Sequence, residues 1–169
     1  MSANEQRIEL DGVIYTINEK EKTANVIEIE PKVKKIFIPC SIKFQSEEYD
    51  VISILSDSFC SPSIKIVEIA PDSKIHTIEK DAFALSYIES ISIPSSVVDI
   101  KDGWCGWTPR LNKIILSPSN QCYSFFDEKM IIGKSSPELS IYNCLVFCIR
   151  NVDSITIPSF IENIFSNSL

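Results

Sequence analysis

The sequence predicts a mainly-β solenoid, a stack of short coils that share one core. A phrase of an aliphatic residue, any residue and a second aliphatic residue, followed one or two positions later by proline, occurs five times. The prolines, Pro39, Pro71, Pro94, Pro118 and Pro158, lie 32, 23, 24 and 40 residues apart. The underlying unit is therefore about 23 residues long, within the range of short solenoid repeats. Each coil of a solenoid buries its apolar face only against its neighbours.

The first segment of each unit is a predicted strand. The five copies are residues 36–38, 67–69, 91–93, 114–116 and 155–157. Because side chains alternate along a strand, Ile36 and Ile38 share the inner face and the residue between them faces solvent. Proline has no N–H to donate to a neighbouring strand, so it is tolerated at a strand end and stops the segment.

A second apolar segment and one bulky residue complete each unit. The second segments are residues 51–54, 75–78, 97–100 and 161–164. Four or five residues after them come Phe59, Phe83, Trp104 and Leu169. Since protein interiors are close-packed, we expect these residues to fill the space between two strand layers as plugs. Turns, with short 3₁₀ or helical pieces, connect the strands.

Residues 8–29 break the repeat and predict an N-terminal β-hairpin. Val13, Tyr15 and Ile17 occupy alternate positions, residues 18–23 form a polar turn, and residues 26–29 are again mostly aliphatic. A hairpin here covers the first coil, whose bare core and unpaired edge otherwise invite association. We therefore divide one structural domain into a cap, residues 1–32, and a repeat region, residues 33–169.

The long interval before Pro158 predicts an insertion in the repeat region. Residues 130–132 and 145–147 are apolar, residues 139–142 are mostly so, and turn residues lie at 133–137. We expect a hairpin over residues 120–150 that projects from one coil and, through residues 123–147, assists binding. The last unit stops at Leu169, in the plug position and without a polar cap. Either the stack is cut short there or a partner covers its end.

Composition and charge restrict the class of partner. The formal net charge of the 169 residues is −7, so no basic surface is expected to neutralise nucleic-acid phosphates. The first residues lack an apolar run after a basic start, and no stretch approaches a membrane span. From the sequence itself we expect a cytoplasmic protein without direct membrane insertion.

The repeat phrase resembles the BspA-type branch of the leucine-rich repeats. Asp81-Ala82-Phe83 and Ile93-Pro94-Ser95-Ser96-Val97 match that family's phrase of isoleucine, proline and valine followed by an Ala-Phe plug. The resemblance covers residues 33–169. It implies a curved right-handed solenoid with a parallel sheet along one face, no catalytic residues and a role in protein or surface recognition. It also implies a cell-surface location, which is typical of that family.

Candidate catalytic and metal sites are weak in this sequence. The single histidine, His76, alternates with inward Ile75, so we expect it on the surface and not as a partnered acid or base. For the six cysteines, including Cys144 and Cys148, three interpretations remain: zinc ligands, a disulfide, or small buried apolar residues. The prediction is a protein that is not an enzyme and has no cofactor or metal.

The candidate binding surface is the outward row of the predicted strands. Phe37 and Ile115 are the apolar members of this row and suit a protein interface, although a merely solvated face is the competing interpretation. Trp107 is added because it lies in a glycine-bracketed aromatic cluster, while Trp104 is expected in the core. The full set is Lys35, Phe37, Glu68, Ser90, Ser92, Trp107, Lys113, Ile115, Ser154 and Thr156.

The function predicted from these observations is non-catalytic recognition of a protein through the strand-lined face, as in an adhesin that binds a host or cell-surface protein. The alternative is a structural, self-assembling module whose exposed C-terminal coil pairs with another chain.

Overall fold

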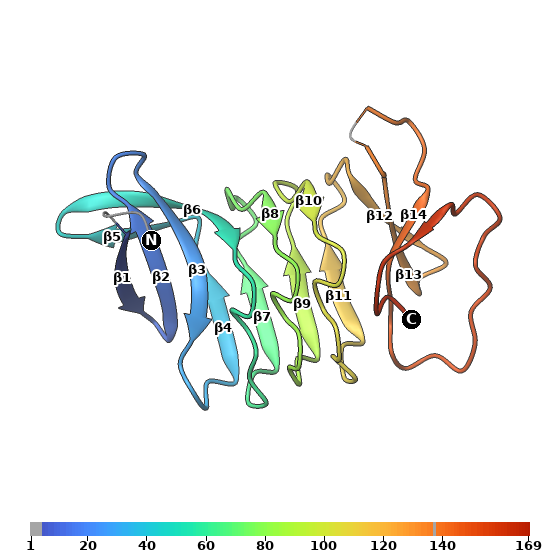
Figure 1. The fold of residues 1–169 in the computed structure, drawn as a ribbon, viewed down its shortest axis with the longest axis horizontal. Helices are drawn as coiled ribbons and strands as arrows, with labels where there is room; N and C mark the ends of the chain where they lie inside the picture. Colours follow the sequence, from blue (N-terminus) through green and yellow to red (C-terminus); the bar gives the residue numbers. More distant parts are fainter. Residues whose placement is uncertain (1–4, 137) are drawn as a thin grey trace.

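The computed structural model describes residues 5–136 and 138–169, and within them it contains strands and turns but no helix. The strands form three sheets: two extend side by side along the stack of coils, and the third follows at the C-terminal end (Figure 1). The prediction of a mainly-β solenoid is confirmed.

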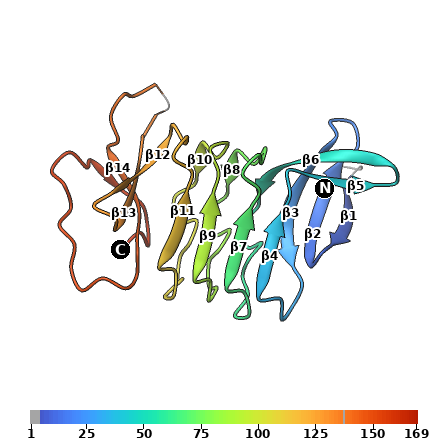
Figure 2. The same ribbon diagram turned by 180° about the vertical axis from the view of Figure 1, so that it is seen from behind.

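Sheet B is the parallel sheet that the repeated phrase predicts. Its strands are β4 (Lys35–Ile38), β7 (Ile66–Ile69), β9 (Ser90–Ile93) and β11 (Lys113–Leu116), in that spatial order. The pairing aligns Ile36 with Val67, Val67 with Ile91, and Ile91 with Ile114. All four side chains are buried. Figure 2 shows the four strands side by side from behind.

Sheet A contains the N-terminal cap and the second apolar segments. Its strands are β1 (Glu5–Leu10), β2 (Val13–Asn18), β3 (Thr23–Ile29), β5 (Ser41–Phe44), β6 (Glu47–Ile54), β8 (Thr77–Ile78) and β10 (Asp99–Ile100). Strands β2 and β3 form the hairpin expected in the cap, and β1 adds a third antiparallel strand to it. Because β3 pairs in parallel with β6, the cap and the coils share one sheet.

Each second segment ends in a turn with one residue in the left-handed conformation. These residues follow the closing isoleucine by three positions and have φ between 59° and 76°: Asp57, Asp81, Gly103 and Asn167. Glycine, asparagine and aspartate tolerate this region better than other residues. The recurrence of these three residue types therefore reflects the same sharp turn in each coil.

The bulky plugs form one continuous row of rings through the core. Phe59 stacks on Phe83 with ring centroids 4.6 Å apart, and Phe83 meets Trp104 edge to face at 5.8 Å. The row continues from Trp104 to Phe147, whose ring centroid lies 5.9 Å away. Phe147 belongs to the inserted segment, so the insertion extends the core.

The inserted segment lies against the stack, whereas the sequence suggested a projecting hairpin. It forms sheet C from β12 (Tyr123–Phe126), β13 (Met130–Gly133), β14 (Cys144–Cys148) and β15 (Asn163–Ile164). Every residue of β13 and β14 is buried. Residues that were expected to extend into solvent therefore supply the last layer of the core.

The fifth copy of the repeated phrase, residues 155–157, forms no strand and does not join sheet B. It lies in the wide loop between β14 and β15, at the red end of the chain in Figure 1. Sheet C stands between this loop and β11 (Figure 1), so the segment has no parallel strand beside it to pair with. Leu169, expected as a buried plug, is 62% exposed.

The plug row predicts that Phe83→Ala lowers the free energy of unfolding by about 3–5 kcal/mol, because the change removes a fully buried ring and leaves a cavity. Urea unfolding followed by circular dichroism measures this loss. The matched control is Phe37→Ala, which removes the same ring from a half-exposed site and should cost well under half as much. Equal losses for the two variants would contradict the continuous ring core.

Candidate binding face

The outward side chains of sheet B stand in two straight rows across its four strands. In one row Phe37 is paired with Glu68, and Ile115 with Ser92. In the other, Lys35 and Lys113 lie at the two ends, with Ile66 and Ser90 between them. Parallel pairing in register thus brings residues from four coils onto one surface.

Phe37 and Ile115 are the apolar anchors of this face. Their side chains are 53% and 52% exposed, and they stand on the two edge strands, β4 and β11. Three strand spacings separate them, or about 14 Å. The rigid sheet therefore holds two apolar contacts at a fixed separation.

A shallow hollow lies beside each anchor. Near Phe37, a hollow of about 550 Å³ is formed with Lys35, Pro39 and the cap residues Leu10 and Tyr15. Near Ile115, one of about 280 Å³ is lined by residues from β7, β9 and β11. The face therefore offers concave places beside its anchors into which a partner's side chains can insert.

Some polar side chains of this face already form ion pairs or hydrogen bonds within the protein. Lys35 pairs with Glu68 at 2.9 Å, an exposed ion pair that contributes about 0–1 kcal/mol to stability. Ser92 has a structural task, because its Oγ accepts a hydrogen bond from Ile69 N at 2.6 Å and donates one to Ile69 O at 3.2 Å. Of the predicted polar members, Ser90 and Lys113 form no hydrogen bond through their side chains to described residues.

The structure does not bring all predicted site residues together. Seven lie on sheet B: Lys35, Phe37, Glu68, Ser90, Ser92, Lys113 and Ile115. Trp107 lies in the connection between β10 and β11, away from this face. Ser154 and Thr156 are exposed in the loop between β14 and β15, because the fifth phrase forms no strand. The predicted surface is therefore limited to four strands.

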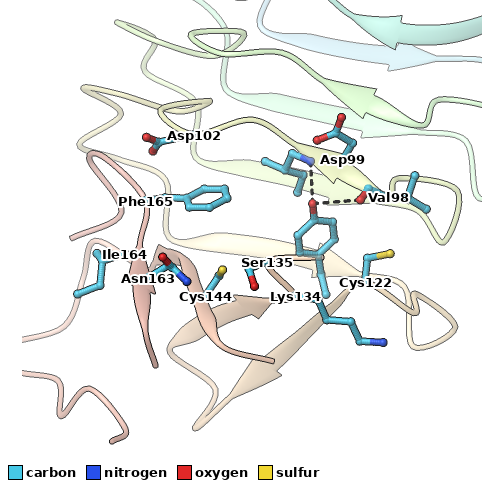
Figure 3. A pocket seen from close by; sticks show the side chains of 12 residues that line it. Val98, Asp99, Asp102, Cys122, Lys134, Ser135, Cys144, Asn163, Ile164 and Phe165 are labelled. Atoms are coloured by element: carbon cyan, nitrogen blue, oxygen red, sulfur yellow. Dashed lines mark hydrogen bonds between the residues drawn. The ribbon is translucent and has the colours of Figure 1, made fainter. Parts of the chain in front are cut away.

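A cleft of about 590 Å³ between β10 and sheet C was not predicted from the sequence (Figure 3). At its wall the Tyr123 hydroxyl accepts a hydrogen bond from Ile100 N at 2.7 Å and donates one to Val98 O at 3.4 Å. The phenol thus takes the place of a neighbouring strand at the edge of β10. Burial raises the pKa of Tyr123 above its usual range.

Asn120 holds Tyr123 in this position. Its Nδ2 donates hydrogen bonds to Pro94 O and Val97 O, while its Oδ1 accepts from Cys122 N and Tyr123 N. An asparagine after a proline-closed strand was the only sequence signal of this arrangement. The acidic side chains at the cleft are also engaged: Asp99 pairs with Lys101, and Asp102 accepts from Ser166. The cleft is therefore a structural junction.

Groups suited to catalysis or metal binding are dispersed in the described part of the chain. His76 is exposed, with Nδ1 2.8 Å from the Thr77 hydroxyl, and no three His, Cys, Asp or Glu side chains there gather around one point. All six cysteines are free, and burial raises the pKa of the Cys105 thiol to about 12, so that it stays protonated at neutral pH. The described residues also include no helix long and apolar enough to cross a membrane.

Comparison with known proteins gives only distant likenesses. No family model and no curated protein matches the chain. A leucine-rich repeat protein from Bacteroides capillosus is 16% identical, with a TM-score of 0.47, over 66% of this chain and 98% of that one. A leucine-rich cell surface protein from Faecalibacterium prausnitzii is 14% identical, with a TM-score of 0.38, over 95% and 66%.

The pneumococcal vaccine antigen PcpA is 12% identical, with a TM-score of 0.34, over 96% of this chain and 61% of that one. These TM-scores are all below 0.5, and the strand pairing of this chain itself establishes the solenoid architecture.

The Tyr123 contacts predict that Tyr123→Phe lowers the free energy of unfolding by about 1–3 kcal/mol, because the buried Ile100 N–H loses its acceptor. Denaturant unfolding measures the loss. Tyr142→Phe is the matched control, since the Tyr142 hydroxyl makes no hydrogen bond to the described residues, and it should leave stability unchanged. Equal effects of the two substitutions would show that Tyr123 does not satisfy the edge of β10.

Proposed function

We propose that this chain is a non-catalytic interaction module that binds another protein through the outward face of sheet B. The observation that carries the proposal is the pair Phe37 and Ile115, each about half exposed on a rigid sheet and each beside a hollow. Large apolar side chains on an exposed surface typically mark recognition sites. A sheet face with Glu68 and Ser92 between the two anchors suits a protein partner better than a small molecule.

The resemblance of the repeats to the BspA type supports a partner at a cell surface, including a host protein, as for an adhesin. A net charge of −7 argues against nucleic acid as the partner.

Self-assembly through the C-terminal side is the second candidate. Strand β15 is an edge strand of sheet C, and Ile164 within it is 50% exposed. An exposed apolar side chain on an edge strand can pair with another chain. Light scattering over a concentration series separates the candidates, because assembly raises the mean mass with concentration and a binding module stays monomeric.

From the exposed anchors of sheet B we predict that Phe37→Glu and Ile115→Glu each weaken capture of a surface protein by at least about tenfold, or about 1.4 kcal/mol. The reason is that each change introduces a charge at an apolar contact. An array of purified extracellular proteins, probed with each variant, measures this. Val98→Glu is the control, since Val98 is exposed to a similar extent but lies off sheet B.

Both face variants are expected to unfold cooperatively with a melting temperature only slightly below that of wild type, because each replaces a half-exposed side chain. If they bind every array member as well as wild type does, sheet B is not the binding surface. If Val98→Glu loses binding as strongly as they do, the recognition surface lies elsewhere.

A further inference from the structure

Two successive coils expose a large apolar side chain at the same position of the repeat. Leu85 follows Ile78 by seven residues and Trp107 follows Ile100 by seven. Both are in the left-handed conformation, with φ of 56° and 57°, and their side chains are 61% and 75% exposed. The same position in two successive repeats thus exposes a large apolar side chain, on the connections that lead into sheet B.

The backbone beneath these residues is firmly held. Leu85 N donates to Gly106 O at 2.9 Å. Directly after each exposed residue, a buried hydroxyl donates to the carbonyl three residues earlier: Ser86 to Phe83 O at 2.7 Å and Thr108 to Cys105 O at 2.8 Å. The exposure of Trp107 is therefore fixed by the coil and does not result from a loose loop.

Leucine and tryptophan are unfavourable residues for this left-handed conformation. A left-handed conformation costs a residue with a Cβ about 1–2 kcal/mol, and glycine avoids that cost. At the recurrent left-handed turn three residues after the closing isoleucine, the chain has glycine, aspartate or asparagine. At the position seven residues after that isoleucine, it has leucine and tryptophan. Large side chains retained in a strained and exposed position are typical of ligand clamps.

The two side chains form the wall of a groove of about 730 Å³, here called the Trp107 groove. Its other lining residues include Pro62, Tyr87 and Pro109. Leucine, tryptophan, tyrosine and two prolines give the groove an apolar, aromatic surface of the kind that accepts extended peptides.

Positive charge gathers at the rim of this groove in a protein that is acidic overall. The Arg110 guanidinium lies 4.7 Å from the centroid of the Tyr87 ring. The Lys65 ammonium lies 5.6 Å from the same centroid and is paired with Glu89 at 3.2 Å. Arg150 lines the groove as well, so two of the three arginines of the chain are located here. Neither arginine is paired with a carboxylate in the part of the chain that the structure describes.

We propose that the Trp107 groove binds an extended segment of a partner protein in which apolar or proline residues alternate with Asp or Glu. The apolar residues contact Trp107, Leu85 and Tyr87, and a carboxylate pairs with Arg110, whose guanidinium can bind it through two N–H groups. This site is separate from the face of sheet B and does not depend on it.

Selection of a display library of random linear peptides against the whole protein tests the proposal. The enriched peptides are expected to combine Asp or Glu with apolar or proline residues. Binding of a synthetic copy of the leading peptide should weaken at least about tenfold with Trp107→Gly and with Arg110→Gln, and also at high salt. Phe37→Glu is the control and should bind as wild type does, so failure of this site and failure of sheet B are distinguishable.

Thermal unfolding of Trp107→Gly supplies the second measurement. Because glycine adopts a left-handed φ freely, this variant should melt at the wild-type temperature or above it. A clearly lower melting temperature would show that Trp107 stabilises the fold, and would overturn the proposal. Enrichment of peptides without acidic residues, or binding unaffected by either substitution, would overturn it as well. A wild-type dimer that Trp107→Gly dissociates would identify a second copy of the chain as the occupant, against the proposal.

Discussion

The whole structure depends on the in-register stacking of aliphatic side chains between parallel strands. Ile36, Val67, Ile91 and Ile114 are buried because each neighbouring coil supplies a side chain at the same height. No single coil could bury its apolar face alone, so the stability of each depends on its neighbours. The ring row from Phe59 to Phe147 adds a second layer with the same dependence.

The same register produces the surfaces of the molecule. If inward side chains align, outward ones must align as well, and the face of sheet B therefore presents straight rows whose composition is free to vary. The connections between coils also repeat, which places Leu85 and Trp107 next to each other along the stack. Binding by such a chain depends on which side chains stand on its surface at fixed distances from one another. The buried side chains maintain those distances.

The sequence predicted what depends on periodicity and missed what depends on single contacts. The isoleucine pairs, the proline stops and the plugs Phe59 and Phe83 were found because they recur. Strand β1 was missed because its charged residues obscure the alternation, and the Tyr123 junction because one hydroxyl and Asn120 create it. Residues 155–157 match the phrase but form no strand, since pairing requires a free neighbouring edge that sheet C removes. For the same reason Ser154 and Thr156 do not belong to the face.

Deletion of coils tests the stacking account most directly. Removing residues 70–93 takes out one complete coil, from the end of β7 to the end of β9, and lets the remaining strands pair in the same register. The account predicts that this shortened chain retains the circular dichroism spectrum of a β protein and one cooperative unfolding transition. Removing only residues 70–81 puts every later side chain out of register and should abolish folding. If both deletions fold equally well, or if neither folds, the coils do not stack as interchangeable repeated units.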